Sequence, residues 1–439
     1  MNFSKPGTFY IIPLMPAPHF SQTKLTMKRN YWIVFLVMMI FFVISFLTNI
    51  MGPLIPDIIK DFKVSNGMAA LLPFSFFIAY GVMSIPAGIL TEKLKEKKIM
   101  IIAFLFAVTG AGIFASFPYF GVALISLFLI GIGMAILQVA INPLLRVAGG
   151  EEHFAFNSVL AQLFFGGASF VSPWVYMYLV ENLKDYSGGG NFVVDTLSGL
   201  VPAGMAWVSL YWIFAVVALV MVMVIALIKL PQVELKEDEK TGGLDAVKHL
   251  LGDRKVILFF LGIFAYVGTE QGVANWISEF LKSYHGMDPE VEGAKAVSYF
   301  WGLLTVGCFL GLGLLKLMDS KIVLRVFTIG AMLALTSALM GGPQVAFYSF
   351  IAVGFSASVM WSVIFSLALN SVKSHHGTLA GILCTGIMGG AIVPLIVGGL
   401  ADVFGLRMGM TFLYITLGYI LSISFWAKPL IRNKTIFNK

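Results

Sequence analysis

Charged side chains are scarce in this sequence. Asp, Glu, Lys and Arg make up 12% of the 439 residues, whereas hydrophobic residues make up 59%. A soluble domain carries roughly 25% charged residues, so this chain could not cover its surface in water. The composition therefore predicts an integral membrane protein. In a soluble protein the net charge of +7 would suggest a nucleic-acid partner. Here we attribute it to the loops and expect no such partner.

Cysteine and histidine are also rare, and their positions exclude several kinds of site. The two cysteines, Cys308 and Cys384, lie in apolar runs without a CxxC motif, so we expect them to be packing residues. All six histidines lie in tails, loops or helix ends, which argues against a histidine relay in the membrane. The chain has no HExxH motif, phosphate-binding glycine loop or paired carboxylates at depth. We therefore expect no enzyme, no metal site and no cofactor beyond a possible coupling ion.

Long hydrophobic runs make up most of the sequence. A membrane-spanning helix needs about 20 apolar residues, and by this rule the chain is an all-α protein with twelve spans. We expect them at about 31–59, 68–91, 98–117, 119–148, 153–182, 205–230, 254–282, 294–317, 321–341, 343–373, 376–402 and 406–429.

Two longer loops suggest how the spans are grouped. Residues 182–204 form a loop rich in glycine and serine, and residues 231–253 form a charged segment near the middle of the chain. We interpret the second as a linker between two six-helix halves, although an ordinary solvated loop would look the same. The expected parts are a disordered extension at 1–26, a first half at 27–230, the linker at 231–253, a second half at 254–430 and a tail at 431–439.

The cations are distributed unevenly between the two sides of the membrane. With the N-terminus inside, the inner segments carry 23 Lys and Arg and the outer segments carry six. Cytoplasmic loops are enriched in these residues. We therefore expect both termini in the cytoplasm and the chain in the inner membrane. The six outer cations are Lys60, Lys63, Lys184, Lys282, Lys295 and Arg407.

One acidic residue interrupts the seventh hydrophobic run. Glu270 lies near the middle of the run from about Val256 to Phe280, and we expect no other acidic residue this deep in any span. A carboxylate at membrane depth is costly unless it is paired, solvated or protonated, and it indicates function by default. A neutral structural glutamate is the alternative. Glu279 lies further along the run, and we expect it at the outer end near Lys282.

The two halves share a weak pattern. Each has an amide near the inner end of its fourth span, a Gly-Gly-Ala triplet in its fifth span and a later proline. Parallel six-helix repeats would leave such a pattern, and the glycines would let helices approach closely. The residues are Asn142, Gly166–Ala168 and Pro173 in the first half and Asn370, Gly389–Ala391 and Pro394 in the second.

The segment Gly88–Lys98 resembles the loop between the second and third spans of the major facilitator superfamily. The family pattern has a glycine, then an acid and a base, then a further pair of bases. The resemblance implies the major facilitator fold and a conformational latch at the inner helix ends. Lys95 stands where the family usually has a second glycine. The matching residues are Gly88, Glu92, Lys93, Lys97 and Lys98.

A narrower resemblance covers both halves, from roughly Phe41 to Ile423. Several segments look like the fucose/glucose/galactose permease family, whose members carry hexoses or deoxyhexoses driven by protons or sodium. The segments are Gln138–Pro143, Ala155–Gln162, Gly166–Ala168, Tyr266–Glu270, Ile364–Asn370 and Gly389–Pro394.

The chain departs from this family at two positions. The fucose permeases use one acid on the first span and one on the fourth, and the aligned residues here are Gly52 and Gln138. Their coupling scheme cannot be transferred, which leaves Glu270 as the main carboxylate for ion coupling.

A sugar substrate, as the resemblance implies, offers hydroxyl groups and one apolar face. Its recognition needs amides or carboxylates and an aromatic platform. Gln138 and Asn142 share one face of the fourth span, and Gln271 and Asn275 share one face of the seventh. Amides also join membrane helices to each other, and tryptophans gather at interfaces. The predicted substrate-binding residues are Gln138, Asn142, Gln162, Gln271, Asn275, Trp276, Trp361 and Asn370.

These observations favour a secondary active transporter. We expect it to take up a monosaccharide by alternating access, coupled to H⁺ or Na⁺ through Glu270, and to act as a monomer in the bilayer. An uncoupled facilitator, or a carrier of another small polar solute, is the first alternative. A sugar sensor without transport is a more distant one.

Overall fold

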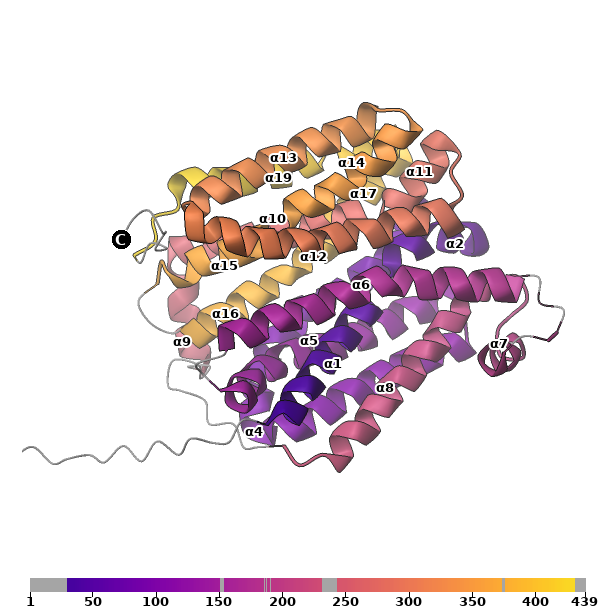
Figure 1. Ribbon diagram of the computed structural model, residues 1–439, viewed down its shortest axis with the longest axis horizontal. Coiled ribbons are helices and arrows are strands. Elements are labelled where there is room, and N and C mark those ends of the chain that lie inside the picture. The colour runs from indigo at the N-terminus through magenta and orange to yellow at the C-terminus, as the bar shows by residue number, and fades with distance from the viewer. Residues whose placement is uncertain are drawn as a thin grey trace, which may run out of the picture.

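The structure is a computed structural model, and it describes residues 30–150, 154–184, 186, 188–189, 191–230, 243–372 and 376–430. Within these residues every regular element is a helix (Figure 1). The expected extension at 1–26, the tail at 431–439 and residues 231–242 of the expected linker lie outside the described part of the chain.

The helices of the first half of the chain are α1 to α8. They are α1 (Tyr31–Thr48), α2 (Met51–Phe62), α3 (Asn66–Ala69), α4 (Leu71–Ser116), α5 (Phe120–Gly149), α6 (Phe154–Lys184), α7 (Phe192–Ser198), the short η2 (Ala206–Val208) and α8 (Ser209–Leu227). Helix α9 (Gly243–Leu251) follows at the middle of the chain.

The helices of the second half run from α10 to α19. They are α10 (Arg254–Ala274), α11 (Ile277–His285), η4 (Pro289–Gly293), α12 (Ala294–Leu317), α13 (Ser320–Met340), α14 (Pro343–Ala357), α15 (Met360–Leu369), α16 (His376–Thr385), η5 (Gly386–Met388), α17 (Gly389–Phe404), α18 (Leu406–Met410) and α19 (Leu413–Trp426).

In the described part of the chain, twelve segments are long and apolar enough to cross a membrane, which confirms the expected number of spans. Several spans consist of two helices. The first span, Tyr31–Phe62, joins α1 to α2 across a break at Asn49 and Ile50. The seventh span, Arg254–Ala274, ends where α11 continues its course after a short break. Apolar residues alone therefore predict the spans, but not the breaks within them.

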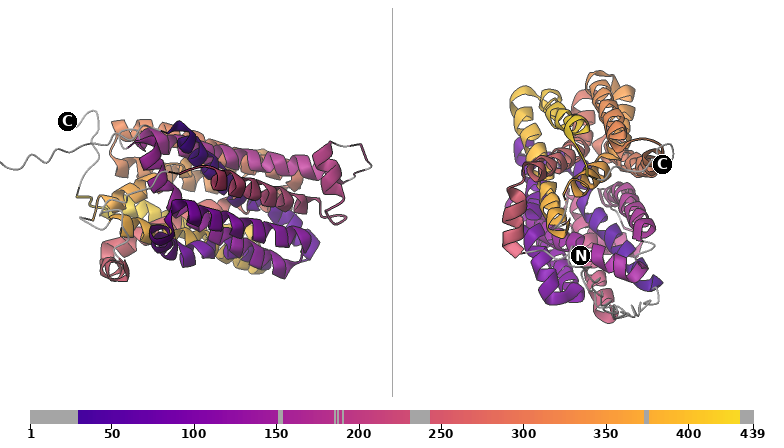
Figure 2. Two further views of the ribbon diagram at one scale, coloured as in Figure 1. Left: turned by 90° about the horizontal axis from the view of Figure 1, so that it is seen from below. Right: turned by 90° about the vertical axis from the view of Figure 1, so that its left-hand side faces the viewer.

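The spans form two helical bundles. Helices α1 to α8 pack together as the N half, and α10 to α19 pack together as the C half (Figures 1 and 2). We call the end at which α1 begins and α19 ends the terminal face. The opposite end, where α7 and α11 lie, is the distal face (Figure 1).

The two halves meet directly at the distal face. The backbone N–H of Gly67 in α3 donates to Asp402 Oδ2 in α17 at 2.9 Å. The ammonium of Lys184 at the end of α6 lies 2.8 Å from Glu290 Oε2 in η4. These contacts join the halves from two sides, so the distal face is closed in this structure.

Both longer loops contain helices that the sequence patterns did not predict. The loop at 182–204 holds α7, which begins after Asn191, whose side chain accepts from the N–H of Val194 at 3.0 Å. The expected linker ends in α9, whose described residues include buried Ala246 and Leu250. Both helices are too short to show a clear hydrophobic period. The segments that flank them are rich in glycine or in charged residues, which are typical of loops.

The predicted latch lies at the terminal face, where α4 carries both the second and the third span. Lys97 Nζ donates to the carbonyl oxygens of Ala226 and Ile228, each at 2.8 Å, and so binds α4 to the end of α8. This cation also satisfies carbonyls that a helix end leaves free. The latch function stays a prediction. Of the other residues, Gly88 is buried, Lys93 and Lys98 are exposed, and the Glu92 side chain lies outside the described part.

Lys95 has a backbone conformation that favours glycine. Its φ of 66° and ψ of 159° break the helix between the second and third spans. Such a conformation costs a residue with a Cβ of order 1–3 kcal/mol. The chain therefore carries a lysine where its own backbone, like the family pattern, calls for a glycine.

We expect Lys95→Gly to stabilise the protein by about 1 kcal/mol, because it removes this strain. The midpoint of thermal unfolding in detergent measures the effect. Lys98→Gly, in the regular helix that follows, is the matched control and should lower stability by about 1 kcal/mol. A Lys95→Gly protein no more stable than the parent would contradict the assignment of strain.

Candidate functional site

Glu270 lies one turn before the end of α10 and is half-buried. Tyr266, one turn earlier on the same helix, donates its hydroxyl to Glu270 Oε1 at 2.6 Å. The i, i+4 spacing places the two side chains on one face of α10. No basic side chain of the described residues forms an ion pair with Glu270. The carboxylate is therefore held by a neutral donor, an arrangement compatible with either protonation state.

A chain of polar side chains leads from Glu270 across to the N half. Gln271 Nε2 donates to Asn49 Oδ1 at 3.3 Å, and Asn49 lies at the break between α1 and α2. Asn49 Nδ2 in turn donates to Ser169 Oγ on α6 at 2.9 Å. Gln271, Asn49 and Ser169 are all buried. This network joins α10, α1 and α6 in the middle of the bundle.

The amide of Asn275 lies at the break between α10 and α11. Its side chain is 2% exposed, and Nδ2 has no hydrogen-bond partner among the described residues. A buried donor without a partner costs about 1–3 kcal/mol. This amide group is therefore available to a ligand, or to a partner in another conformation.

The two tryptophans predicted to contact substrate differ in their surroundings. Trp361 on α15 is half-buried, with its ring 6.1 Å from that of Tyr266 and stacked on Phe365. Trp276 is fully buried and donates its indole N–H to the carbonyl oxygen of Pro394 at 3.3 Å. In this conformation Trp361 lies beside Tyr266, the residue that donates to Glu270, and Trp276 packs the closed distal side.

The remaining predicted amides lie nearer the terminal face. Gln138 is half-buried on α5, and Asn142 is exposed and donates to the Gln138 carbonyl oxygen at 3.2 Å. Gln162 on α6 is exposed, and Asn370 at the end of α15 is half-buried. Among the described residues, no hydrogen bond joins Gln138, Asn142, Gln162 or Asn370 to the polar network around Glu270.

Other buried acids lie nearer the ends of their spans than Glu270 does. Asp57 on α2 is 7% exposed and accepts a hydrogen bond from the hydroxyl of Tyr176 on α6 at 2.5 Å. Glu96, at the start of the third span, is 5% exposed. The expectation that Glu270 is the deepest acid within a span stays a prediction, but hydropathy did not show that α6 covers Asp57 on α2. Asp57 lay inside the predicted first span, and that was the available signal.

The described residues contain no group of three His, Cys, Asp or Glu side chains arranged to hold a metal ion.

Comparison with known proteins identifies the family. The sequence model of the Major Facilitator Superfamily matches residues 37–393. The chain belongs to the major facilitator superfamily. The twelve helical spans of the described residues are the fold expected for this superfamily, and relatives of this chain are named as a transporter and a symporter rather than as enzymes.

Curated relatives confirm the narrower resemblance. A glucose/galactose transporter of Brucella abortus is 31% identical over 422 residues, which covers 92% of this chain and 97% of the relative. An L-fucose-proton symporter of Escherichia coli is 26% identical, covering 86% of this chain and 89% of the relative.

Two solved structures show the same fold. FucP in the outward conformation matches with a TM-score of 0.66 at 23% identity, covering 90% of this chain and 98% of FucP. A bacterial homologue of the human lysosomal transporter Spinster, in an inward-facing conformation, matches with a TM-score of 0.72 at 15% identity. The match covers 90% of this chain and 96% of the homologue.

Proposed function

We propose that this protein takes up a monosaccharide by alternating access, coupled to H⁺ or Na⁺ through Glu270. The observation that carries the proposal is a polar network in which Glu270 bonds with Tyr266 and with Gln271, and Gln271 donates to Asn49 of the N half. It joins an ionisable side chain to a hydrogen bond between the two halves. A change of charge at Glu270 can therefore alter how the halves pack.

The orientation follows from the charges. With 23 of its Lys and Arg on the side of the termini and six on the other, the chain should lie in the inner membrane with the terminal face in the cytoplasm. The distal face would then be the outer face, and the present conformation is closed to the outside.

The class of substrate is supported by the named relatives and by the side chains in the spans. A glucose/galactose transporter and an L-fucose-proton symporter both align along most of this chain. Asn275 offers an unpaired amide Nδ2, and Trp361 offers a ring beside Tyr266. These groups suit the hydroxyls and the apolar face of a hexose.

An uncoupled facilitator is the second candidate, because Gly52 and Gln138 replace the two acids that the fucose permeases use. Uptake of labelled glucose, galactose and fucose into proteoliposomes, with and without an imposed proton or sodium gradient, separates the two. Coupled transport predicts accumulation above the outside concentration under one gradient. Saturable uptake that stops at equal concentrations under both gradients would favour the facilitator.

We expect Trp361→Ala to raise the KM for the transported sugar by about 5- to 10-fold, because a lost ring contact is worth about 1 kcal/mol. Initial rates of uptake over a range of sugar concentrations measure the effect. Trp32→Ala, at an 81% exposed position, is the control and should leave KM unchanged. An unchanged KM in Trp361→Ala would remove this ring from the sugar site.

A further inference from the structure

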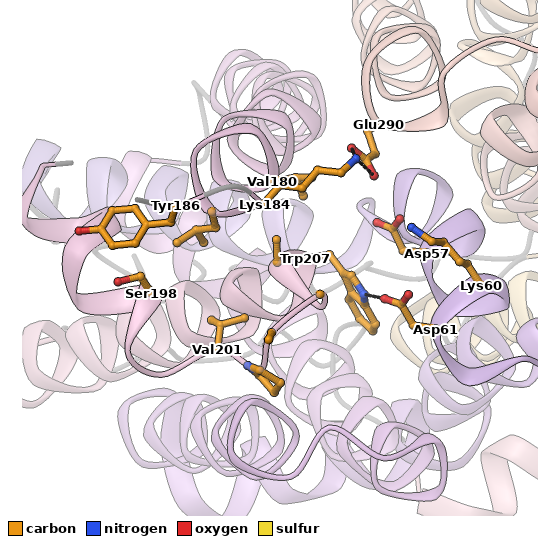
Figure 3. Close-up of a pocket in the computed structure, with 15 residues that line it drawn as sticks. Asp57, Lys60, Asp61, Val180, Lys184, Tyr186, Ser198, Val201, Trp207 and Glu290 are labelled. Carbon is orange, nitrogen blue, oxygen red and sulfur yellow. Dashed lines mark hydrogen bonds and ion pairs between the residues drawn. The ribbon is translucent and has the colours of Figure 1, made fainter. Parts of the chain in front are cut away.

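A pocket at the distal face brings together charged residues from both halves. Its volume is about 330 Å³, and α2, α6, the segment after α7 and η4 line it (Figure 3). Asp57, Lys60 and Asp61 enter it from α2, Lys184 enters from α6, and Glu290 enters from η4. Only Glu290 belongs to the C half, so the pocket is complete only while the halves are closed.

Asp57 is the deepest of these groups. Its side chain is 7% exposed, and its one described hydrogen bond comes from the neutral hydroxyl of Tyr176. Asp61, one turn further on, is half-buried and accepts from the indole N–H of Trp207 at 2.7 Å. A buried carboxylate without a bonded cation is costly in its ionised form.

One of the two lysines that line the pocket, Lys184, is already paired. Lys184 Nζ lies 3.0 and 2.8 Å from the two carboxylate oxygens of Glu290, and its side chain is 53% exposed whereas that of Glu290 is 20% exposed. This pair bridges α6 and η4 across the boundary between the halves. When the halves part, Glu290 must leave the pocket and Lys184 loses its partner.

The surroundings of Asp57 therefore change with closure in a defined way. Most charged or titratable neighbours lie in the N half and move with Asp57. Closure adds the acids of the C half, engages Lys184 and removes water. All three changes favour a protonated Asp57. The neighbours in the N half are Lys60, Asp61, Tyr176 and Lys184, and those in the C half are Glu290 and Asp288.

We propose that Asp57 is a proton-binding residue, and that a proton on Asp57 stabilises the closed distal face held by Lys184 and Glu290. Linkage requires that closure takes up a proton if Asp57 binds it more tightly in the closed state. Acid therefore favours closure and alkali favours opening. The inference goes beyond ion coupling through Glu270 and does not require it.

Distances between two spin labels at the distal face test the proposal without sugar. Labels are placed at Leu200 in the N half and Met408 in the C half, which are 47% and 57% exposed, after Cys308 and Cys384 are replaced by alanine. Between about pH 5 and pH 8.5 the ratio of open to closed distances should rise by about 10-fold or more. Asp57→Asn should stay closed and lose this pH dependence.

Asp61→Asn is the matched control, because it removes a charge one turn away and should retain the pH dependence. A pH dependence in Asp57→Asn equal to that of the parent would overturn the proposal. If Asp57→Asn does not fold, Glu290→Gln decides the question at a more exposed position. It should open more readily and show a smaller pH dependence, and an unchanged pH dependence would again overturn the proposal.

Glu270→Gln with the same labels separates this inference from the proposed function. The pH dependence of the distal face should persist in that variant, whereas concentrative uptake should not. Coupled uptake in the parent without any pH dependence at the distal face would contradict the role of Asp57 but not the proposed function. The expected pH dependence at the distal face with no coupled uptake would contradict the proposed function but not the role of Asp57.

Discussion

Replacing Glu270 by glutamine should reduce sugar accumulation from about 10-fold or more above the outside concentration to equality, while exchange of internal for external sugar continues. A glutamine keeps the shape of the side chain and can still accept the hydrogen bond of Tyr266, which measures 2.6 Å in the structure. It cannot bind and release a proton or balance the charge of a sodium ion. A tenfold accumulation requires about 1.4 kcal/mol from the ion gradient, and this variant has no group to receive it.

Glu279→Gln provides a matched control within the same hydrophobic run. Glu279 is buried, at 7% exposure, and Lys282 lies 3.3 Å from its carboxylate. Its replacement should leave accumulation within about twofold of the parent, because it lies outside the network between the halves. Labelled sugar in proteoliposomes under an imposed gradient measures both variants, and counterflow measures exchange. Undiminished accumulation in Glu270→Gln would refute coupling through this residue.

Gly52→Val should reduce the initial rate of uptake by about 10-fold or more, because the distal face could no longer close. A Cβ at Gly52 would collide with the carbonyl oxygen of Ala274 and come within 3.1 Å of Val297 Cγ2. Both neighbours belong to the C half, so the N half can still fold around the larger side chain. Close-packed interfaces do not absorb such a collision without moving apart.

The same spin labels at Leu200 and Met408 should report an open distal face in Gly52→Val. Gly112→Val is the control, since a Cβ there meets nothing within 4 Å. It should transport at the parental rate and close normally. Parental rates of uptake in Gly52→Val would show that this close approach is dispensable.

The membrane spans could be predicted from the sequence because the bilayer imposes a simple requirement on length and polarity. The breaks within spans could not, since they depend on which backbone groups find partners in neighbouring helices. The break after α1 places Asn49 where it bonds both Ser169 and Gln271, residues 120 and 222 positions away in the chain. No local pattern contains that information.

The buried acids show the same limit of prediction from sequence. Glu270 stood out because its neighbours in sequence are apolar over a long run. Asp57 did not, because it lies near the end of its span, beside Lys60 and Asp61, and its burial comes from Tyr176 of α6. Glu279 was correctly expected beside Lys282, since the two are three residues apart on one helix. Short-range pairs were predictable, and pairs between helices were not.

Sugar-evoked entry of a cation into proteoliposomes tests the central claim most directly. Vesicles without any ion gradient receive external glucose, galactose or fucose while a trapped dye reports internal pH and a tracer reports sodium entry. The account predicts that a transported sugar drives protons or sodium inward in the parent and in Glu279→Gln, but not in Glu270→Gln. Saturable sugar entry in the parent with no movement of either ion would contradict it.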